Sequence, residues 1–577
     1  MTLLELLFAV YAAVGGLILI VWRSAGRRIW RWIAVIGGVL TLAVLAGGSH
    51  RMEAVPMIVV AVIVALFAFR RSRRQSSPPN HRRRVLAATL RYTAALLVVL
   101  IVVLDTAFIE IFDPLSNAPL LDLFGGPQTP DFSHFTWPDA FEKLNDHLSR
   151  AYALGAWKRI DWKALHDITA PKVADAARTR DRAAYYLALR EYLWSLNDTH
   201  VDLSGDDGGL RYTAIGGGYG IQFVRLDDGR TINHVLIEGG PAASQGMEWG
   251  ATILRWNGMA VDDAAAGTSV LWSGGPGATH EGKRLLRLRF LTRAPVGTSA
   301  TVVFQNPDET ITRTATLIAV DDKFESWRLA DLPEFSNQSN VEWRLLPDGI
   351  GYVKIHEEIP TLQQLLPDRA MQHAVAAFGR AGAKGVVIDV RGNSGGADKL
   401  VPRMMGFFFA TRQFYEHTTS YDEATSRFER QAFGTLWTEP RMPNFTGPIA
   451  VLVDEWCISS CEGFALIARR RTGAHIVGFY GTYGSFGMSG AQVLMPSGLT
   501  VEYPAGQSLD ENGVVQLDGD WRLEGGVTPT IRVPLTKDTV RAQFKDGRDV
   551  VLETAIRTLS APGARIGIAK VCAFSHF

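Results

Sequence analysis

The sequence predicts an α/β core built on a parallel sheet, joined to a helical region and preceded by an all-α membrane domain. Two apolar, β-branched runs, residues 449–453 and 385–390, have the length of buried parallel strands. Each run leads into a turn rich in serine or glycine, and such turns gather at the carboxyl ends of the strands in an α/β sheet. Long apolar runs near the N-terminus add the membrane domain.

Residues 1–112 are predicted to form four transmembrane helices. Their near-continuous hydrophobic runs are close to the roughly 20 residues that span a bilayer, and they cover residues 3–22, 30–47, 54–69 and 85–104. The alternative for the first run is a cleaved signal peptide. That alternative lacks a basic segment before the run and a clear small-residue cleavage site after it.

Arginines predict the orientation of these helices. They are concentrated in the loops after the first and third runs, whereas only Arg51 lies between the second and third. The positive-inside rule places the two arginine-rich loops in the cytoplasm and residues 113–577 on the periplasmic or extracellular side of the cytoplasmic membrane. A patch for lipid or nucleic acid is the alternative for the second loop.

Composition sets the broad class. The 577 residues are 47% hydrophobic and carry a net charge of +1, which excludes a disordered or strongly nucleic-acid-binding protein. Residues 113–135 are rich in Pro, Gly and Asp and are predicted to be a linker. Apolar residues at helical spacing then predict a helical region over residues 136–203.

Ser459 is the candidate nucleophile. It stands with Ser460 just before residues 463–468, whose composition suits a helix. A serine there is close to unpaired backbone N–H groups and to the positive end of the helix dipole, which would stabilise an anion. The alternative is that Ser459 only caps the helix. A second strand-end loop favours the nucleophile, because Gly395 and Gly396 offer unobstructed N–H groups to the same cleft.

These motifs resemble the tail-specific, or C-terminal processing, protease family. The resemblance covers most of residues 130–535 and includes IDVRGNSGG, a serine-rich turn with a glutamate, and TYGSFG. It implies a ClpP/crotonase-like catalytic core over residues 323–558, with a tail over 559–577. It also implies Ser459 as nucleophile and an oxyanion hole formed by the N–H of Ser460 with that of Gly395 or Gly396.

The general base differs from that of the processing-protease branch. That branch has a lysine in the glycine loop, where residues 481–487 here carry Ser485, which cannot accept a proton at neutral pH. The tricorn-like branch uses a histidine instead, and LNDTHVDL resembles its histidine segment. This resemblance implies His200 as the base, oriented by Thr199 and by the distant Glu524. The alternative is an inactive site.

Residues 211–322 resemble a PDZ domain. The loop Gly218-Tyr219-Gly220-Ile221 stands where such a domain holds a C-terminal carboxylate by backbone N–H groups, beside a strand edge that pairs with the peptide. The alternative is a PDZ fold that serves as a gate or a spacer.

Three further features of the sequence concern a surface loop, a possible metal site and two cysteines. Residues 413–445 are polar, aromatic and irregular and are predicted to be a surface loop. The sequence starting at His356 lacks the second histidine of a zinc-binding H-E-x-x-H motif, so we expect no metal site and no cofactor. Cys457 and Cys461 flank Ser459; extracytoplasmic exposure permits a disulfide between them, and a cysteine nucleophile is the alternative.

The predicted protein is a membrane-anchored, extracytoplasmic serine endopeptidase that cleaves proteins or peptides recruited by their C-termini. Its expected partners are these substrates and membrane lipid, not nucleic acid. One alternative is a catalytically inactive, PDZ-containing peptide-binding or signalling protein. Another is a hydrolase of non-peptide acyl compounds, because nothing in the sequence defines the leaving group.

Overall fold

A computed structural model of the chain describes residues 129–330, 340–359, 364, 366–488 and 490–561. All of them belong to one unit that starts at Pro127. The four predicted membrane runs, most of the predicted linker and nearly all of the predicted tail lie outside the described residues. Among the helices described, none has both the length and the apolar character needed to cross a bilayer.

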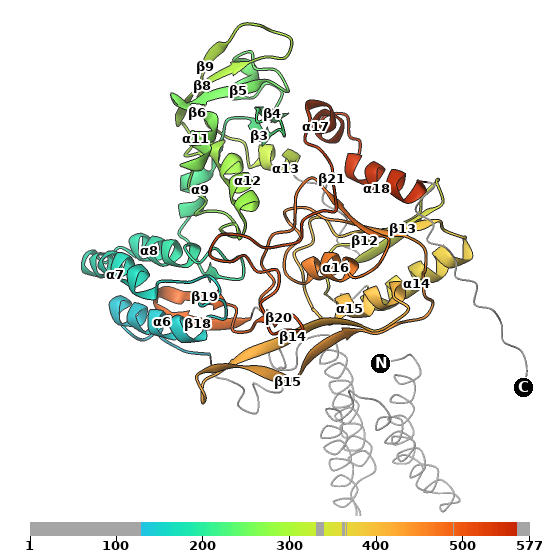
Figure 1. The fold of residues 1–577 in the computed structure, drawn as a ribbon. Coiled ribbons are helices and arrows are strands. Elements are labelled where there is room, and N and C mark those ends of the chain that lie inside the picture. Colours follow the sequence, from blue (N-terminus) through green and yellow to red (C-terminus); the bar gives the residue numbers. More distant parts are fainter. Residues whose placement is uncertain (1–128, 331–339, 360–363, 365, 489, 562–577) are drawn as a thin grey trace, which may run out of the picture. The chain divides into compact units, whose positions relative to one another are not determined.

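The core is a six-stranded sheet in the order β11-β12-β13-β16-β17-β21. Figure 1 labels three of these strands, β12, β13 and β21. Neighbouring strands are parallel from β12 to β21, and only β11 runs antiparallel to β12. The strands are β11 (Val341–Leu345), β12 (Ile350–Ile355), β13 (Gly385–Asp389), β16 (Ile449–Leu452), β17 (Ala474–Gly478) and β21 (Ile531–Arg532). The two apolar runs singled out in the sequence are therefore adjacent parallel strands, as predicted.

Helices cover both faces of this sheet, which explains its near-continuous apolar strands. Ile350 packs in one cluster with residues of α18 (Val550–Ser560). On the other face, Gly351 lies so close to α14 (Pro367–Arg380) that a Cβ there would be 2.6 Å from Phe378. After β21, α17 (Lys537–Phe544) ends before Asp549 caps α18.

The carboxyl ends of β13 and β16 meet at one edge of the sheet. The register pairs Val386 with Ile449 and Asp389 with Leu452, so the glycine-rich loop after β13 and the turn before α16 (Ser460–Ala468) leave the sheet side by side. This is the convergence of two strand-end loops that the sequence predicts.

Three helices form the predicted helical region: α6 (Trp137–Ala151), α7 (Trp162–Thr179) and α8 (Arg182–Trp194). Each begins at a side-chain cap, from Thr136, Asp161 or Asp181. The short strand β1 (Asp202–Ser204) follows and joins a sheet with β19 (Leu499–Tyr503) and β18 (Ala491–Met495). Tyr503 and Val501 of β19 share one apolar cluster with α6 and α8, so this sheet attaches the helical region to the core.

The PDZ-like region is an antiparallel sheet in the order β3-β4-β5-β8-β9, with α12 (His280–Leu291) against β3. Its strands are β3 (Ile221–Arg225), β4 (Thr231–Leu236), β5 (Thr252–Trp256), β8 (Ser299–Gln305) and β9 (Arg313–Ile318). Leu226 and Ile232 pack with Val540 of α17 and with Tyr480, so this region has an apolar contact with the catalytic core. Its assignment as a PDZ domain stays a prediction.

The prediction of an irregular loop over residues 413–445 was wrong. Most of this stretch is a hairpin of β14 (Gln413–Asp422) and β15 (Arg427–Thr438), and β14 also pairs with β20 (Ser508–Leu509). The strands contain two register shifts, between Phe414 and Glu416 and between His417 and Thr419. Such irregularities interrupt the two-residue alternation by which a strand is found in a sequence.

Candidate active site

Ser459 has a backbone that few residues other than glycine adopt, with φ 58° and ψ −133°. It stands at the start of α16, yet its side chain does not cap the helix. Its backbone N–H instead donates to the carbonyl of Ser485 at 2.9 Å. A strained serine at the junction of a strand-end turn and a helix, with a hydroxyl not used as a cap, has the geometry of a nucleophile elbow.

The glycine-rich loop after β13 lies against this serine. A Cβ on Gly395 would be 2.7 Å from the Cβ of Ser459, so only glycine allows this approach. The N–H of Gly395 donates to Asn393 Oδ1 at 2.7 Å and is therefore occupied. Gly396 forms a parallel bridge with Glu358, and the hydrogen bonds of this bridge are made by its neighbours Gly395 and Ala397. The N–H of Gly396 itself therefore points away from Glu358. Of the two predicted donors on this loop, the geometry leaves Gly396.

His200 lies just before β1, and its side chain is 9% exposed. Its Nδ1 is 3.6 Å from Asp198 Oδ1, and its backbone N–H donates to the same oxygen at 3.0 Å. Within the described residues neither ring nitrogen has a hydrogen-bond partner. Burial lowers the pKa of this imidazole, but the opposing effect of Asp198, with smaller effects of Asp518 and Glu462, leaves the pKa above its usual value.

Asp198 is the carboxylate that faces the histidine, and it was not among the predicted site residues. It is fully buried, and the hydroxyl of Tyr152 donates to its Oδ2 at 2.8 Å. Burial alone would raise the pKa of this carboxyl, but His200 and Lys158 hold it well below its usual value, so Asp198 is an anion. Its signal in the sequence was a carboxylate two residues before the histidine of LNDTH.

The two residues predicted to orient His200 lie in different surroundings. Thr199 is close to the site, because its N–H donates to the hydroxyl of Ser485 at 3.4 Å. The Glu524 side chain is 63% exposed and is paired with Arg522 at 2.9 Å, and the described contacts do not join it to the histidine. Ser485 thus contacts both the nucleophile segment and the histidine segment.

Asp518 is a second buried carboxylate, and its charge acts on the pKa of His200. It is 2% exposed, and its Oδ1 accepts the N–H groups of Phe486 and Gly487 at 2.8 and 3.1 Å. Its Oδ2 has no partner among the described residues. Burial, with the negative charge of Asp198, raises the pKa of Asp518 to about 6.

Glu462 organises the glycine loop from the first turn of α16. It is fully buried, and it accepts the N–H of Ser485 at 2.8 Å, the N–H of Gly484 at 3.0 Å and the hydroxyl of Thr482 at 2.5 Å. Burial raises its pKa to about 8, so it is largely a neutral acid at neutral pH. Its hydrogen bonds fix the loop that carries Ser485.

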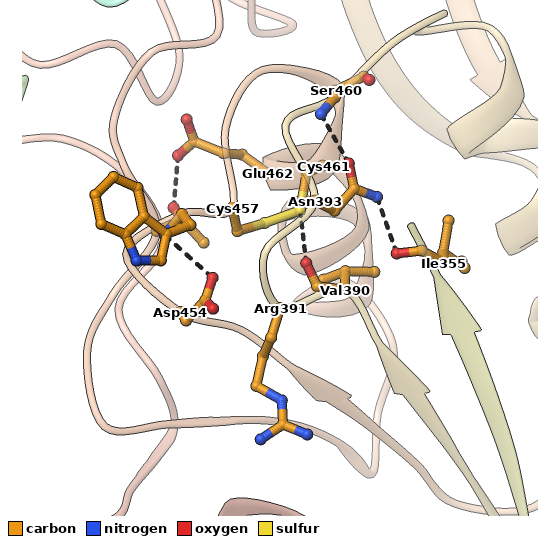
Figure 2. The surroundings of a disulfide bond; sticks show 12 residues. Ile355, Val390, Arg391, Asn393, Asp454, Cys457, Ser460, Cys461 and Glu462 are labelled. Atoms are coloured by element: carbon orange, nitrogen blue, oxygen red, sulfur yellow. Dashed lines mark hydrogen bonds between the residues drawn. A yellow bond between two sulfur atoms is a disulfide. The ribbon is translucent and has the colours of Figure 1, made fainter. Parts of the chain in front are cut away.

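Cys457 and Cys461 form a disulfide across the nucleophile turn (Figure 2). Both residues are fully buried. The pairing decides a question that the sequence left open, and it removes a free thiol as the nucleophile. The five residues from Cys457 to Cys461, with Ser459 at their centre, form one covalent ring.

The PDZ-like region reaches the histidine segment through residues 275–283. Gly275 packs directly against the Thr199 side chain, and the N–H of Gly277 donates to the hydroxyl of Tyr483 at 3.0 Å. Lys283 of α12 donates to the side-chain oxygen of Asn197. Two of these contacts, with Thr199 and Asn197, therefore hold the histidine segment, and the third holds the glycine loop.

The predicted carboxylate-binding loop, Gly218-Tyr219-Gly220-Ile221, is buried throughout. A Cβ on Gly218 would be 2.5 Å from Arg293 Nη1, and Arg293 is paired with Asp322 at 2.7 Å. In this structure the loop is covered by the protein's own side chains. Elsewhere, no group of His, Cys, Asp and Glu side chains in the described part of the chain is arranged to hold a metal ion.

Comparisons with known proteins relate part of the chain to a peptidase family and its fold to solved structures. Residues 349–533 match Peptidase family S41. Mature CPAF complexed with lactacystin is 16% identical, with a TM-score of 0.52 over 74% of this chain and 98% of that one. A mutant of CPAF is 15% identical, with a TM-score of 0.53 over 75% and 99%. The photosystem II D1 C-terminal processing protease is 19% identical over 74% and 98%, with a TM-score of 0.35. No curated protein matches significantly.

Proposed function

Because residues 349–533 of this chain belong to peptidase family S41, we propose that the protein is a serine endopeptidase with Ser459 as nucleophile and His200 as general base. The observation that carries this proposal is the arrangement around Ser485, whose carbonyl accepts the N–H of Ser459 and whose hydroxyl accepts the N–H of Thr199. Ser485 therefore connects the strained Ser459 to the segment that carries His200.

In the first step, Ser459 Oγ attacks the carbonyl carbon of a peptide bond while His200 takes the hydroxyl proton. The negative charge that develops on the carbonyl oxygen is stabilised by the N–H groups of Ser460 and Gly396. The tetrahedral intermediate collapses when His200 returns the proton to the leaving amine, which leaves an acyl group on the serine. Water then attacks this ester with the same base, and the carboxylic acid product and free Ser459 result.

Asp198 supports both steps by stabilising the imidazolium that forms on His200. Its fixed negative charge, 3.6 Å from Nδ1, makes the protonated ring more stable. The Nε2 atom, which is also unpaired, remains available for the serine proton. Asp518 adds further negative charge near the ring.

For the location, we propose a membrane-anchored protein with its catalytic part outside the cytoplasm. The apolar runs within residues 1–112 and the arginines in two of their loops support this proposal. The buried Cys457–Cys461 disulfide adds support, because disulfides persist in oxidising compartments.

For substrate selection, we propose that the PDZ-like region captures protein C-termini. The resemblance of Gly218-Tyr219-Gly220-Ile221 to a carboxylate-binding loop supports this proposal. Because Arg293 and Asp322 cover Gly218, binding requires these side chains to move. That movement would alter a region which also contacts the histidine segment, so capture would be linked to the catalytic site.

The proposed activity is tested by labelling the purified full-length protein with a fluorophosphonate. The expected result is one label on Ser459 in the wild-type protein and none in Ser459→Ala. The matched control is Ser394→Ala, a serine on the neighbouring loop whose hydroxyl contacts Glu357; it should label like the wild type. A wild-type protein that neither takes the label nor cleaves an unfolded protein substrate would contradict the proposal.

A further inference from the structure

Glu358 is a buried acid to which neither the sequence motifs nor the proposed mechanism gives a role. It follows β12 and is fully buried. Its Oε1 accepts the side-chain amide of Asn393 at 2.7 Å, and its Oε2 is 2.8 Å from the hydroxyl of Ser460. One carboxyl group therefore connects the loop after β13 to the first residue of α16.

The backbone of Glu358 reinforces this connection. Its N–H donates to the carbonyl of Gly395 at 3.2 Å, and its carbonyl accepts the N–H of Ala397 at 2.8 Å. The side chain of Asn393, held by Glu358, in turn accepts the N–H of Gly395. Gly396, the residue between these contacts, is thereby fixed from both sides.

Ser460, which bonds Glu358 directly, and Gly396, which lies between two residues that bond the backbone of Glu358, are the two proposed oxyanion donors. An oxyanion hole is effective only when its donors are about 2.7–3.1 Å from the developing charge. Gly395 and Gly396 have φ values of 102° and 152°. Because glycine can adopt many backbone conformations, these residues do not fix the loop by themselves. The loop therefore needs an external anchor to keep its distance from Ser460.

We propose that Glu358 is a positioning residue that sets the separation of the oxyanion donors on Ser460 and Gly396. This inference rests on the proposed peptidase function and extends it to a third segment of the core. Glu358 is not a catalytic residue, because it acts through Asn393, Ser460 and its own backbone.

The charge state of Glu358 is consistent with this role. Burial raises its pKa to about 7, and Asp398 adds to this, while the hydrogen bonds of Asn393 and Ser460 oppose it. When neutral, the acid can donate its own proton to Ser460 Oγ and still accept the Asn393 amide. A glutamine can form the same two hydrogen bonds, whereas leucine has a similar size and can form neither.

The test compares Glu358→Leu with Glu358→Gln in full-length protein, using a peptide substrate. In Glu358→Leu we expect kcat to fall about tenfold to hundredfold, which is no more than the effect of removing one oxyanion donor. KM should stay within about twofold of the wild-type value. Glu358→Gln should retain kcat within about threefold, because it keeps both hydrogen bonds. The matched control is the adjacent Glu357→Gln, which should behave like the wild type.

A second measurement separates positioning from folding and from substrate binding. The Glu358→Leu, Ser459→Ala double variant should bind the peptide with the same Kd as Ser459→Ala alone. Both of these variants should show a cooperative thermal transition. If Glu358→Leu does not fold, Ser460→Ala provides the test, since it removes one hydrogen bond of Glu358 and keeps the backbone N–H. It should lower kcat about threefold to tenfold without changing KM.

Three results would overturn the inference: full kcat in Glu358→Leu, a change confined to KM, or an equal loss in the glutamine and leucine variants. Each of these results differs from a failure of the proposed function. If the proposed function were wrong, Ser459 of the wild-type protein would not react with the fluorophosphonate.

Discussion

The carbonyl of Ser485 accepts the backbone N–H of Ser459 at 2.9 Å. The Ser485 hydroxyl also accepts the N–H of Thr199, so one residue of the glycine loop connects the strained serine to the histidine segment. Ser485 stands where the resemblance places a lysine base in the processing-protease branch. Here that position holds two segments together, and the proton acceptor must come from elsewhere.

The His200→Ala variant tests whether His200 is this proton acceptor. We expect His200→Ala to lower kcat/KM by at least about a thousandfold, because the serine then has no base, while the oxyanion donors retain a small residual rate. The measurement is steady-state cleavage of a peptide, with thermal unfolding as a check on folding. Ser485→Ala is the comparison and should cost far less, since the carbonyl that holds Ser459 is retained. Undiminished turnover in His200→Ala would end the proposal.

The pH dependence should depend on Asp198. His200 acts as a base only when neutral, and Asp198 keeps its pKa above the ordinary value. Activity should therefore fall as the pH decreases through a pKa above ~6.5. Asp198→Asn removes the negative charge that favours the imidazolium, so the acid limb should move to lower pH and kcat should fall. Profiles of kcat/KM between pH 5 and pH 9 would show this, and a limb that stayed in place would contradict the role given to Asp198.

Reduction of the disulfide should weaken both activity and stability. The Cys457–Cys461 bond closes a very short ring that contains Ser459. Loop-closure entropy for such a ring is worth about 2 kcal/mol of unfolding free energy. We expect a Cys457→Ala, Cys461→Ala double variant to lose about this much in urea unfolding and to show a lower kcat. A reducing agent should affect the wild type and not the double variant, and equal sensitivity of the two would contradict the assignment.

Capture of C-termini predicts a difference between free-acid and amidated peptides of one sequence. Amidation removes the charge and replaces an acceptor by a donor, which typically costs about 1.5–3 kcal/mol for a charge-assisted contact. If capture only recruits the substrate, KM should rise for the amide. Because the loop at Gly218 is covered and its region contacts Thr199, we expect kcat to fall as well. Equal kcat/KM for both peptides would show that the region is a spacer.

The proposed topology predicts the behaviour of reporter fusions. Alkaline phosphatase joined after Asp113 should be active, because it would lie outside the cytoplasm, and a fusion within residues 75–80 should be inactive. The opposite pattern would refute the orientation and leave the catalytic proposal unaffected.

Local patterns in the sequence were sufficient to predict the centre of the fold. The buried strands at residues 385–390 and 449–453 and their convergent loops are recognisable because apolar runs and glycine-rich turns are short-range signals. The hairpin of β14 and β15 was missed because its register shifts break the alternation. A strand that is irregular in space gives no regular period in the sequence.

The site residues that were missed act across the chain. Asp198 was overlooked because the resemblance directed attention to Glu524, and only burial distinguishes the two carboxylates: one is buried and the other is on the surface. No motif in the sequence assigned a role to Glu358. Its partners Asn393 and Ser460 come from two other segments, and no spacing rule connects them. Such contacts arise only once the sheet has brought its strand ends together.

The order in which the ribosome makes these segments has its own consequence. His200 is synthesised early, whereas Ser459 and Ser485, the residue that connects the two segments, are synthesised much later. A nascent chain that stops before Ser485 has a serine and a histidine but lacks the residue that connects their segments. We therefore expect a truncated chain that ends before Ser485 to lack the proposed proteolytic activity.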